Sequence, residues 1–246
     1  MKNNHTSCIN NSSQQSSHFF KSLKRLFNPE ALDFFITEID HALKTLTVSP
    51  ISNTPSPTDL VTDPVTGLKT SAPPLTPEET KNSGSLVRVN HTGEICAQAL
   101  YRGQAFLADN PKTRSYLLQA AAEENDHLAW CQARLKTLNT HPSYLNFFWY
   151  THSWLIGLTA ALWSDSLSLG FVVETENQVI AHLNTHLEKL SKSDIKTRLI
   201  FEQMKKDEAH HAQTALQEGA MTTLPKPIQI LMRWVSKIMT TTAFYI

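Results

Sequence analysis

The chain has 246 residues, and its 22 Lys and Arg balance its 22 Asp and Glu. A net charge of zero excludes a nucleic-acid binder held by bulk electrostatic attraction. With only 7 glycines, Gly-rich phosphate loops and turn-rich β architectures are not expected. The 3 cysteines form no C-x-x-C pair, which excludes a thiolate zinc site and a disulfide scaffold and suits a reducing compartment.

The N-terminal part of the chain divides into three segments. Residues 1–29 are rich in Ser and Asn and lack acids, so we expect a disordered tail, with a transit peptide as the alternative. Apolar residues then recur at helical spacing from Ala31 to Leu46, which predicts an amphipathic helix over 30–47. Residues 48–75 read as a linker rich in Pro, Ser and Thr.

From residue 76 onward the sequence pattern is helical. Thr76-Pro77-Glu78-Glu79 is a capping box with Pro at the first helical position. Apolar periodicity then predicts helices at about 85–108, 111–138, 144–163, 166–190, 195–218 and 225–242. No strand-like alternation competes with these patterns, so 76–246 is predicted to be an all-α bundle.

Two of these helices contain the motif Glu-x-x-His, as Glu124 to His127 and Glu208 to His211. Residues three apart share a helix face, so both side chains can reach one metal ion. An isolated match of this kind is usually a solvated face. Here each pair continues an apolar stripe at bundle spacing, which predicts that all four side chains point inward.

Two further helices place a single acid in a similar stripe. Glu176 interrupts a line of aliphatic residues from Leu169 to Leu190, while Glu94 lies among mostly apolar neighbours from Val87 to Ala108. Burying such a carboxylate is costly unless it is paired, protonated or metal-bound. In chain order the four helices offer Glu, Glu-x-x-His, Glu and Glu-x-x-His. This is the ligand set of the ferritin-like di-metal bundles. Its four carboxylates balance the charge of two ferrous ions.

At these positions the sequence resembles the di-iron demethoxyubiquinone hydroxylases, which install a late ring hydroxyl in ubiquinone biosynthesis. The likeness covers about residues 30–246 and is closer to the bacterial branch than to the mitochondrial one. The matching stretches are Leu86-Val87-Arg88-Val89-Asn90-His91-Thr92-Gly93-Glu94, Glu123-Glu124-Asn125-Asp126-His127-Leu128-Ala129-Trp130-Cys131, Ser168-Leu169-Gly170-Phe171-Val172-Val173-Glu174-Thr175-Glu176 and Asp207-Glu208-Ala209-His210-His211-Ala212.

The resemblance implies a ferritin-like four-helix bundle with additional crossover and membrane-facing helices. It also implies two irons with the ligands Glu94, Glu124 and His127 for one and Glu176, Glu208 and His211 for the other. Glu124 and Glu208 would bridge the pair. The implied activity is a monooxygenase that uses dioxygen to hydroxylate the ring of a demethoxyubiquinol. A ferritin-like iron-binding or detoxification protein and a di-metal peroxidase are the alternatives.

Other residues near the implied ligands have two interpretations each. His182 and His186 either orient the ligand carboxylates or pass protons, or they are ordinary polar positions on a bundle helix, which is the simpler reading. His91 either hydrogen-bonds a ligand or has a capping or surface role. Tyr101 resembles a radical tyrosine in its placement, but core packing explains it more simply.

Two segments indicate contact with a membrane surface. The apolar face of 225–242 comprises Ile228, Leu231, Met232, Val235, Ile238 and Met239. Lys226, Arg233 and Lys237 accompany it and no acid follows Glu218, so this is a basic amphipathic helix; a helix docked on the bundle is the alternative. The aromatic segment 144–163 is expected to be a crossover helix with a lipid-dipping edge rather than a membrane span.

The expected location follows from these segments and from the resemblance. We expect peripheral attachment to the cytoplasmic side of the cell (inner) membrane, with the matrix side of the mitochondrial inner membrane as the alternative. The expected partners are a polyprenyl quinol substrate, other ubiquinone-biosynthesis proteins and further copies of the chain, and no nucleic acid.

Overall fold

The computed structural model describes residues 20, 24, 29–60 and 74–246. Over these residues it contains seven α-helices, one short 3-10 helix and no strand, which confirms the all-α prediction. The tail expected over 1–29 lies outside the described residues except at 20, 24 and 29, and so does the 61–73 part of the expected linker.

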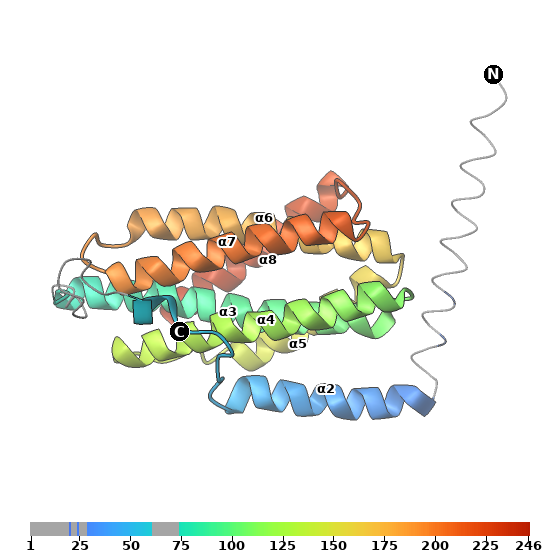
Figure 1. Ribbon diagram of the computed structural model, residues 1–246, viewed down its shortest axis with the longest axis horizontal. Helices are drawn as coiled ribbons and strands as arrows, with labels where there is room; N and C mark the ends of the chain where they lie inside the picture. The colour runs from blue at the N-terminus through green and yellow to red at the C-terminus, as the bar shows by residue number, and fades with distance from the viewer. Residues whose placement is uncertain (1–19, 21–23, 25–28, 61–73) are drawn as a thin grey trace, which may run out of the picture.

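Four long helices form the bundle: α3 (Pro77–Leu107), α4 (Pro111–Thr137), α6 (Asp165–Lys189) and α7 (Ile195–Gln217). In Figure 1, α3 runs beside α4 and α6 runs beside α7, so that the bundle has two layers. The capping box begins α3: the Thr76 hydroxyl accepts from the Glu79 amide, and the Glu79 carboxylate accepts from the Thr76 amide. The helix therefore begins earlier than apolar periodicity predicts. Periodicity misses this first part of the helix because residues 81–85 are mostly polar and carry no apolar pattern.

The crossover helix α5 (Asn146–Ala161) connects α4 to α6 and packs closely along α3. A Cβ atom on Gly157 would lie 2.2 Å from the Leu100 carbonyl oxygen. A Cβ atom on Gly103 would likewise lie 2.3 Å from the Trp154 carbonyl oxygen. Two glycines thus allow the backbones of α3 and α5 to meet, which no larger residue at either position permits.

The last helix, α8 (Lys226–Tyr245), packs against α3 and α6. At its C-terminal end the Arg88 guanidinium donates to the Phe244 carbonyl oxygen at 3.1 Å, and Ala243 is buried. Much of its remaining apolar surface is exposed, including Leu231 and Ile238. Within the described part of the chain, no helix combines the length and the apolar character needed to cross a bilayer.

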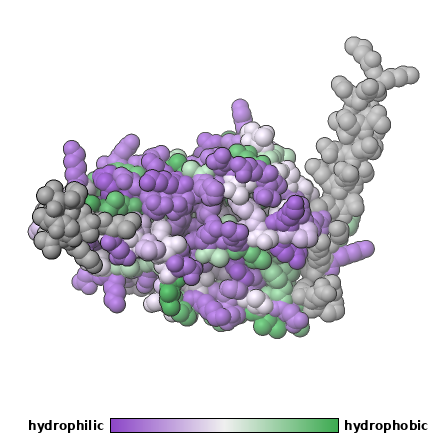
Figure 2. All heavy atoms as spheres, in the orientation of Figure 1, coloured by the Kyte–Doolittle hydropathy of each residue, from purple (hydrophilic) through white to green (hydrophobic). Residues whose placement is uncertain are grey.

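Residues 29–60 form an N-terminal arm that lies along the bundle (Figure 1), and Figure 2 shows hydrophobic side chains among hydrophilic ones along this lower edge of the molecule. Its helix α2 (Pro29–Thr47) coincides with the amphipathic segment read from the sequence, and its buried Glu38 pairs with both Nε and Nη2 of Arg102, at 2.9 and 2.5 Å. After α2, the Asn53 amide and the Thr54 hydroxyl donate to the Asp126 carboxylate at 2.7 and 2.8 Å. The arm is therefore docked on α3 and α4, and the 3-10 helix η1 (Pro57–Leu60) at its end packs against α7.

Candidate metal centre

Each of the four bundle helices carries acidic or histidine side chains to the middle of the bundle. Glu94 comes from α3, Glu176 from α6, and the two Glu-x-x-His pairs from α4 and α7. All six side chains predicted to bind metal are buried, with exposed fractions between 0% and 4%. So many ionisable groups removed from water need opposite charges close by.

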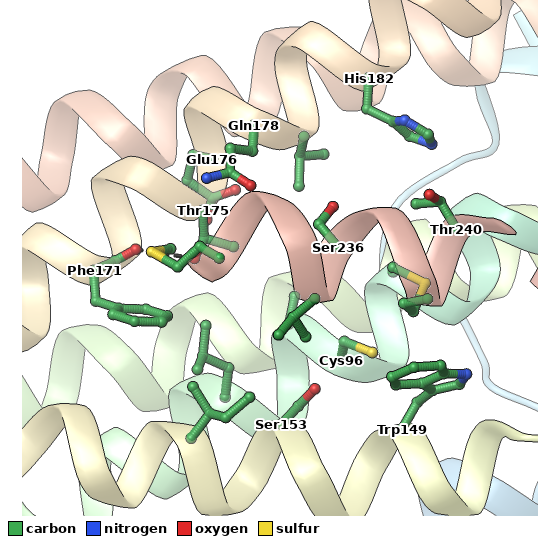
Figure 3. Close-up of a pocket in the computed structure, with 18 of the residues that line it drawn as sticks. Cys96, Trp149, Ser153, Phe171, Thr175, Glu176, Gln178, His182, Ser236 and Thr240 are labelled. Atoms are coloured by element: carbon green, nitrogen blue, oxygen red, sulfur yellow. Dashed lines mark hydrogen bonds between the residues drawn. The ribbon is translucent and has the colours of Figure 1, made fainter. Parts of the chain in front are cut away.

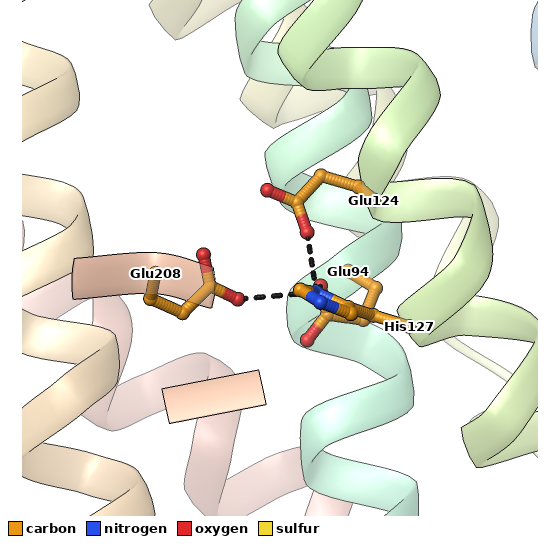
Figure 4. Close-up of side chains that lie close together, drawn as sticks. All are labelled: Glu94, Glu124, His127 and Glu208. Atoms are coloured by element: carbon orange, nitrogen blue, oxygen red, sulfur yellow. Dashed lines mark hydrogen bonds and ion pairs between the residues drawn. The ribbon is translucent and has the colours of Figure 1, made fainter. Parts of the chain in front are cut away.

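The six side chains form two groups that share two members. In each group the potential ligand atoms lie within 4.8 Å of one another; the groups are Glu94, Glu124, His127 and Glu208, and Glu124, Glu176, Glu208 and His211. Figure 4 shows the first group, in which the carboxylates of Glu124 and Glu208 point at the His127 ring. Because Glu124 and Glu208 belong to both groups, they have the position that a bridging carboxylate requires.

Both histidines direct Nδ1 into the cluster. His127 Nδ1 lies 2.9 Å from Glu124 Oε2 and 3.3 Å from Glu208 Oε1. The same nitrogen lies 3.6 Å from Glu94 Oε2. His211 Nδ1 lies 3.2 Å from both Glu208 Oε2 and Glu124 Oε1. Nδ1 is therefore the atom that each imidazole offers to a metal.

The outer nitrogen of each histidine meets a carboxylate from the opposite helix. His127 on α4 has Nε2 at 3.1 Å from Asp207 Oδ2 on α7. His211 on α7 has Nε2 at 2.9 Å from Glu123 Oε2 on α4. Such carboxylates orient a metal-binding imidazole and set which nitrogen carries the proton. Sequence reasoning missed both, although the signal is an acid directly before each motif glutamate.

Burial and mutual contact shift the pKa values of the clustered side chains in opposite directions. Burial, and the neighbouring carboxylates, raise the pKa of Glu94 and of Glu176 well above the usual value. Burial alone would lower the pKa of His127, but hydrogen bonds to Asp207 and Glu124 outweigh it and raise the pKa well above its usual value. The pKa of Glu124 is lowered: burial opposes this, and the hydrogen bond from His127 together with the adjacent His211 ring overcomes it. Metal binding would therefore release protons.

The donor set fits a pair of first-row metal ions. Carboxylate oxygens mixed with imidazole nitrogens suit iron or manganese, and the described residues bring no thiolate into either group. Among the residues that the structure describes, one oxygen, Glu124 Oε1, is buried without hydrogen-bond geometry to any partner, although it lies 3.2 Å from His211 Nδ1. A buried acceptor in this state is the kind of atom that a cation satisfies.

A cavity of about 310 Å³ adjoins the cluster, between α3, α5, α6 and α8. Glu94, Glu176 and Glu208 line it on the side of the cluster. Most of its other walls are apolar, and Figure 3 shows Phe171 and Trp149 facing it from α6 and α5. The apolar face predicted for α8 forms a further wall and contributes Ile228, Leu231, Met232, Val235 and Met239.

Three further histidines lie near the cluster. His186 is buried and accepts at Nδ1 from the Asn90 side chain at 3.0 Å, so its partner is a neighbouring amide and not a ligand carboxylate. His91 is also buried, which excludes the suggested surface role, and burial lowers its pKa to about 4. His182 lines the cavity instead of joining either metal group, and burial lowers its pKa to about 4.

Tyr101 does more than fill the core. It is fully buried, and its hydroxyl donates to Glu176 Oε1. Core packing alone, which the sequence favoured for this residue, is therefore an incomplete explanation. The sequence held no signal for the contact beyond the shared stripe of Tyr101 and Glu94, because the partner Glu176 lies on another helix.

Comparison with known proteins agrees with this arrangement. The family model described as "Ubiquinone biosynthesis protein COQ7" matches residues 81–243. A 3-demethoxyubiquinol 3-hydroxylase of Coxiella burnetii is 49% identical over 88% of this chain and 96% of its own length. The enzymes of that name from Legionella pneumophila and Polynucleobacter asymbioticus are 48% and 46% identical, each over 87% of this chain and over 97% and 99% of their own lengths. The chain therefore belongs to the COQ7 family of ubiquinone biosynthesis proteins, which are ferritin-like helical bundles.

Proposed function

We propose that the chain is a di-iron monooxygenase that hydroxylates the ring of a demethoxyubiquinol with dioxygen, a late step of ubiquinone biosynthesis. One observation carries the proposal: a buried cluster of carboxylates and imidazoles borders an apolar cavity large enough for a substituted ring. The printed names of the relatives, which are 3-demethoxyubiquinol 3-hydroxylases, support the same reaction.

The two groups of ligand atoms support a centre with two irons. One would be held by Glu94, Glu124 and His127, and the other by Glu176, Glu208 and His211, with Glu124 and Glu208 shared. The chemistry supplied by the bound metals is the reduction of dioxygen, with one oxygen atom passing to the ring and the other leaving as water at the expense of an external electron donor. The protein keeps the ligands in place through Asp207 and Glu123.

The cavity walls perform three tasks in this scheme. Apolar side chains such as Phe171, Trp149 and Leu100 exclude water and give the ring a surface to pack on. Polar side chains among them, including Ser153 and His182, are available to hydrogen-bond the ring oxygens. Because Glu94, Glu176 and Glu208 border the same space, a ring in the cavity lies beside the metal positions.

We further propose peripheral attachment to the cytoplasmic face of the cell membrane through α8, with α5 beside it. Both helices line the cavity, and both expose large apolar side chains, such as Leu231 on α8 and Leu155 on α5. Lys226, Arg233 and Lys237 accompany the apolar residues of α8, and no acid follows Glu218. A basic amphipathic helix of this kind favours an anionic lipid surface, from which a polyprenyl quinol can present its ring while its tail stays in lipid.

Metal content provides the first test. Purified without oxygen and supplied with ferrous iron, the chain should bind about two irons, because six ligands of this type fill one dinuclear centre. His211→Ala should lose iron, whereas the neighbouring exposed His210→Ala should keep it. Full iron content in His211→Ala would contradict the ligand assignment.

The quinone pool provides the second test. A strain lacking this gene should accumulate a demethoxy precursor, and the wild-type chain should restore ubiquinone. Glu176→Ala should fail to restore it, whereas Glu174→Ala, whose carboxylate accepts from Gln178 on the same helix, should succeed. Iron uptake by the purified protein without any effect on the precursor would favour iron storage or detoxification instead.

A further inference from the structure

Tyr101 is the residue whose contact with the centre the proposed reaction leaves unexplained. It lies on α3 two helical turns beyond Glu94, in the same core cluster as Leu117, Leu169 and Val173. The exposed fraction of the side chain is 0%, so its hydroxyl must find a partner inside the bundle. That partner is one oxygen of Glu176.

Glu176 differs from the other three carboxylates of the centre. Glu124 and Glu208 contact both histidines, and Glu94 contacts His127. The hydrogen bond that Glu176 accepts comes instead from Tyr101, at Oε1. Glu176 also lines the cavity. Whether its carboxylate binds a metal through one oxygen or through both therefore decides how accessible that metal is from the ring-binding cavity.

We infer that Tyr101 is a positioning residue that makes Glu176 a one-oxygen ligand. A carboxylate can give a metal one oxygen or both. Because the hydrogen bond from the tyrosine hydroxyl draws on the lone pairs of Oε1, Oε2 would be the stronger donor to the metal, and the coordination position that Oε1 would fill would stay open. The inference rests on the proposed di-iron centre and adds a specific role for a residue outside the six ligands.

The test uses Tyr101→Phe, with azide as a probe of the open position. Azide is titrated into the iron-loaded, air-oxidised protein, and its charge-transfer absorption reports binding to the metal. Without the hydroxyl, Glu176 can supply both oxygens and close the position. Azide affinity should then fall by about ten- to hundredfold, the factor that corresponds to losing one hydrogen bond to a charged group, while iron content stays at the wild-type level.

Two tyrosines provide matched controls. The Tyr116 hydroxyl donates to the backbone carbonyl of His211 at 2.9 Å, close to the centre but not to a ligand atom. The hydroxyl of Tyr150 is buried and has no hydrogen-bond partner in the described part of the chain. Tyr116→Phe and Tyr150→Phe should both bind azide as the wild type does. A fall of similar size in either control would show that removing any hydroxyl perturbs the centre, and would overturn the inference.

The remaining outcomes are also decisive. Unchanged azide affinity in Tyr101→Phe would show that the hydroxyl does not control how Glu176 binds the metal, which overturns the inference. Loss of iron from Tyr101→Phe would mean that the tyrosine is needed for metal binding itself, which also overturns the inference. If Tyr101→Phe fails to fold, a fluorotyrosine at position 101 keeps the packing and donates more strongly; azide must then bind at least as tightly as in wild type. Absence of iron from the wild-type chain would instead refute the proposed function.

Discussion

The metal-free protein should become less stable as the pH rises above neutral. Glu94, Glu176, His127 and His211 all have a pKa raised by the folded structure, so each keeps a proton in the folded state that the unfolded chain has lost. Stability from such groups is complete below their unfolded pKa values and is lost as the pH rises toward the folded ones. Glu124 has a lowered pKa, so its contribution is lost only in acid and is constant here.

The magnitude follows from the number of protons involved. Each proton held only by the folded state makes the free energy of unfolding fall by about 1.4 kcal/mol per pH unit. The two histidines alone, above their unfolded pKa of 6.5, therefore give about 2.7 kcal/mol per unit. Bound metal replaces these protons, so stabilisation by iron or manganese should increase over the same range.

Urea denaturation in the presence of a chelator, at several pH values between about 7 and about 8.5, measures this slope. His211→Gln removes one of the protonated groups and should lessen the slope by about 1.4 kcal/mol per unit. The exposed neighbour provides the control, since His210→Gln should leave the slope unchanged. A metal-free protein whose stability is constant or rises with pH over this range would refute the reasoning.

Three further outcomes are expected. Asp207→Asn weakens the support of His127 and should lower metal affinity by about ten- to hundredfold, measured by competition with a chelator; unchanged affinity would make the contact incidental. Combined Leu231→Asp and Val235→Asp should release the protein from anionic liposomes while its iron content stays at the wild-type level; unchanged partition to the liposomes would make α8 a helix that only packs on the bundle. Gly157→Ala places a methyl group against the backbone of α3 and should cost about 1–3 kcal/mol in the free energy of unfolding; a neutral result would mean that α5 shifts freely.

The sequence by itself determined the helical class and the composition of the metal cluster. Helical periodicity assigns each residue to a face of its own helix, and the stripes through Glu94, Glu124, Glu176 and Glu208 are the ones that the bundle buries. The capping box at Thr76 likewise marks where α3 begins. These properties are local, because they depend on residues within a few turns of one another.

Only the tertiary structure decided which side chains meet across helices. The contact between Asp207 and His127, the burial of His186 beside Asn90, and the donation from Tyr101 to Glu176 each join residues more than 70 positions apart. Such contacts depend on which helices are neighbours and on how far each helix slides along its neighbour, and periodicity within one helix specifies neither. The glycine contacts between α3 and α5 are among the features that set the relative position of these two helices. Because both helices line the cavity beside the metal positions, these contacts also help to set the shape of the cavity.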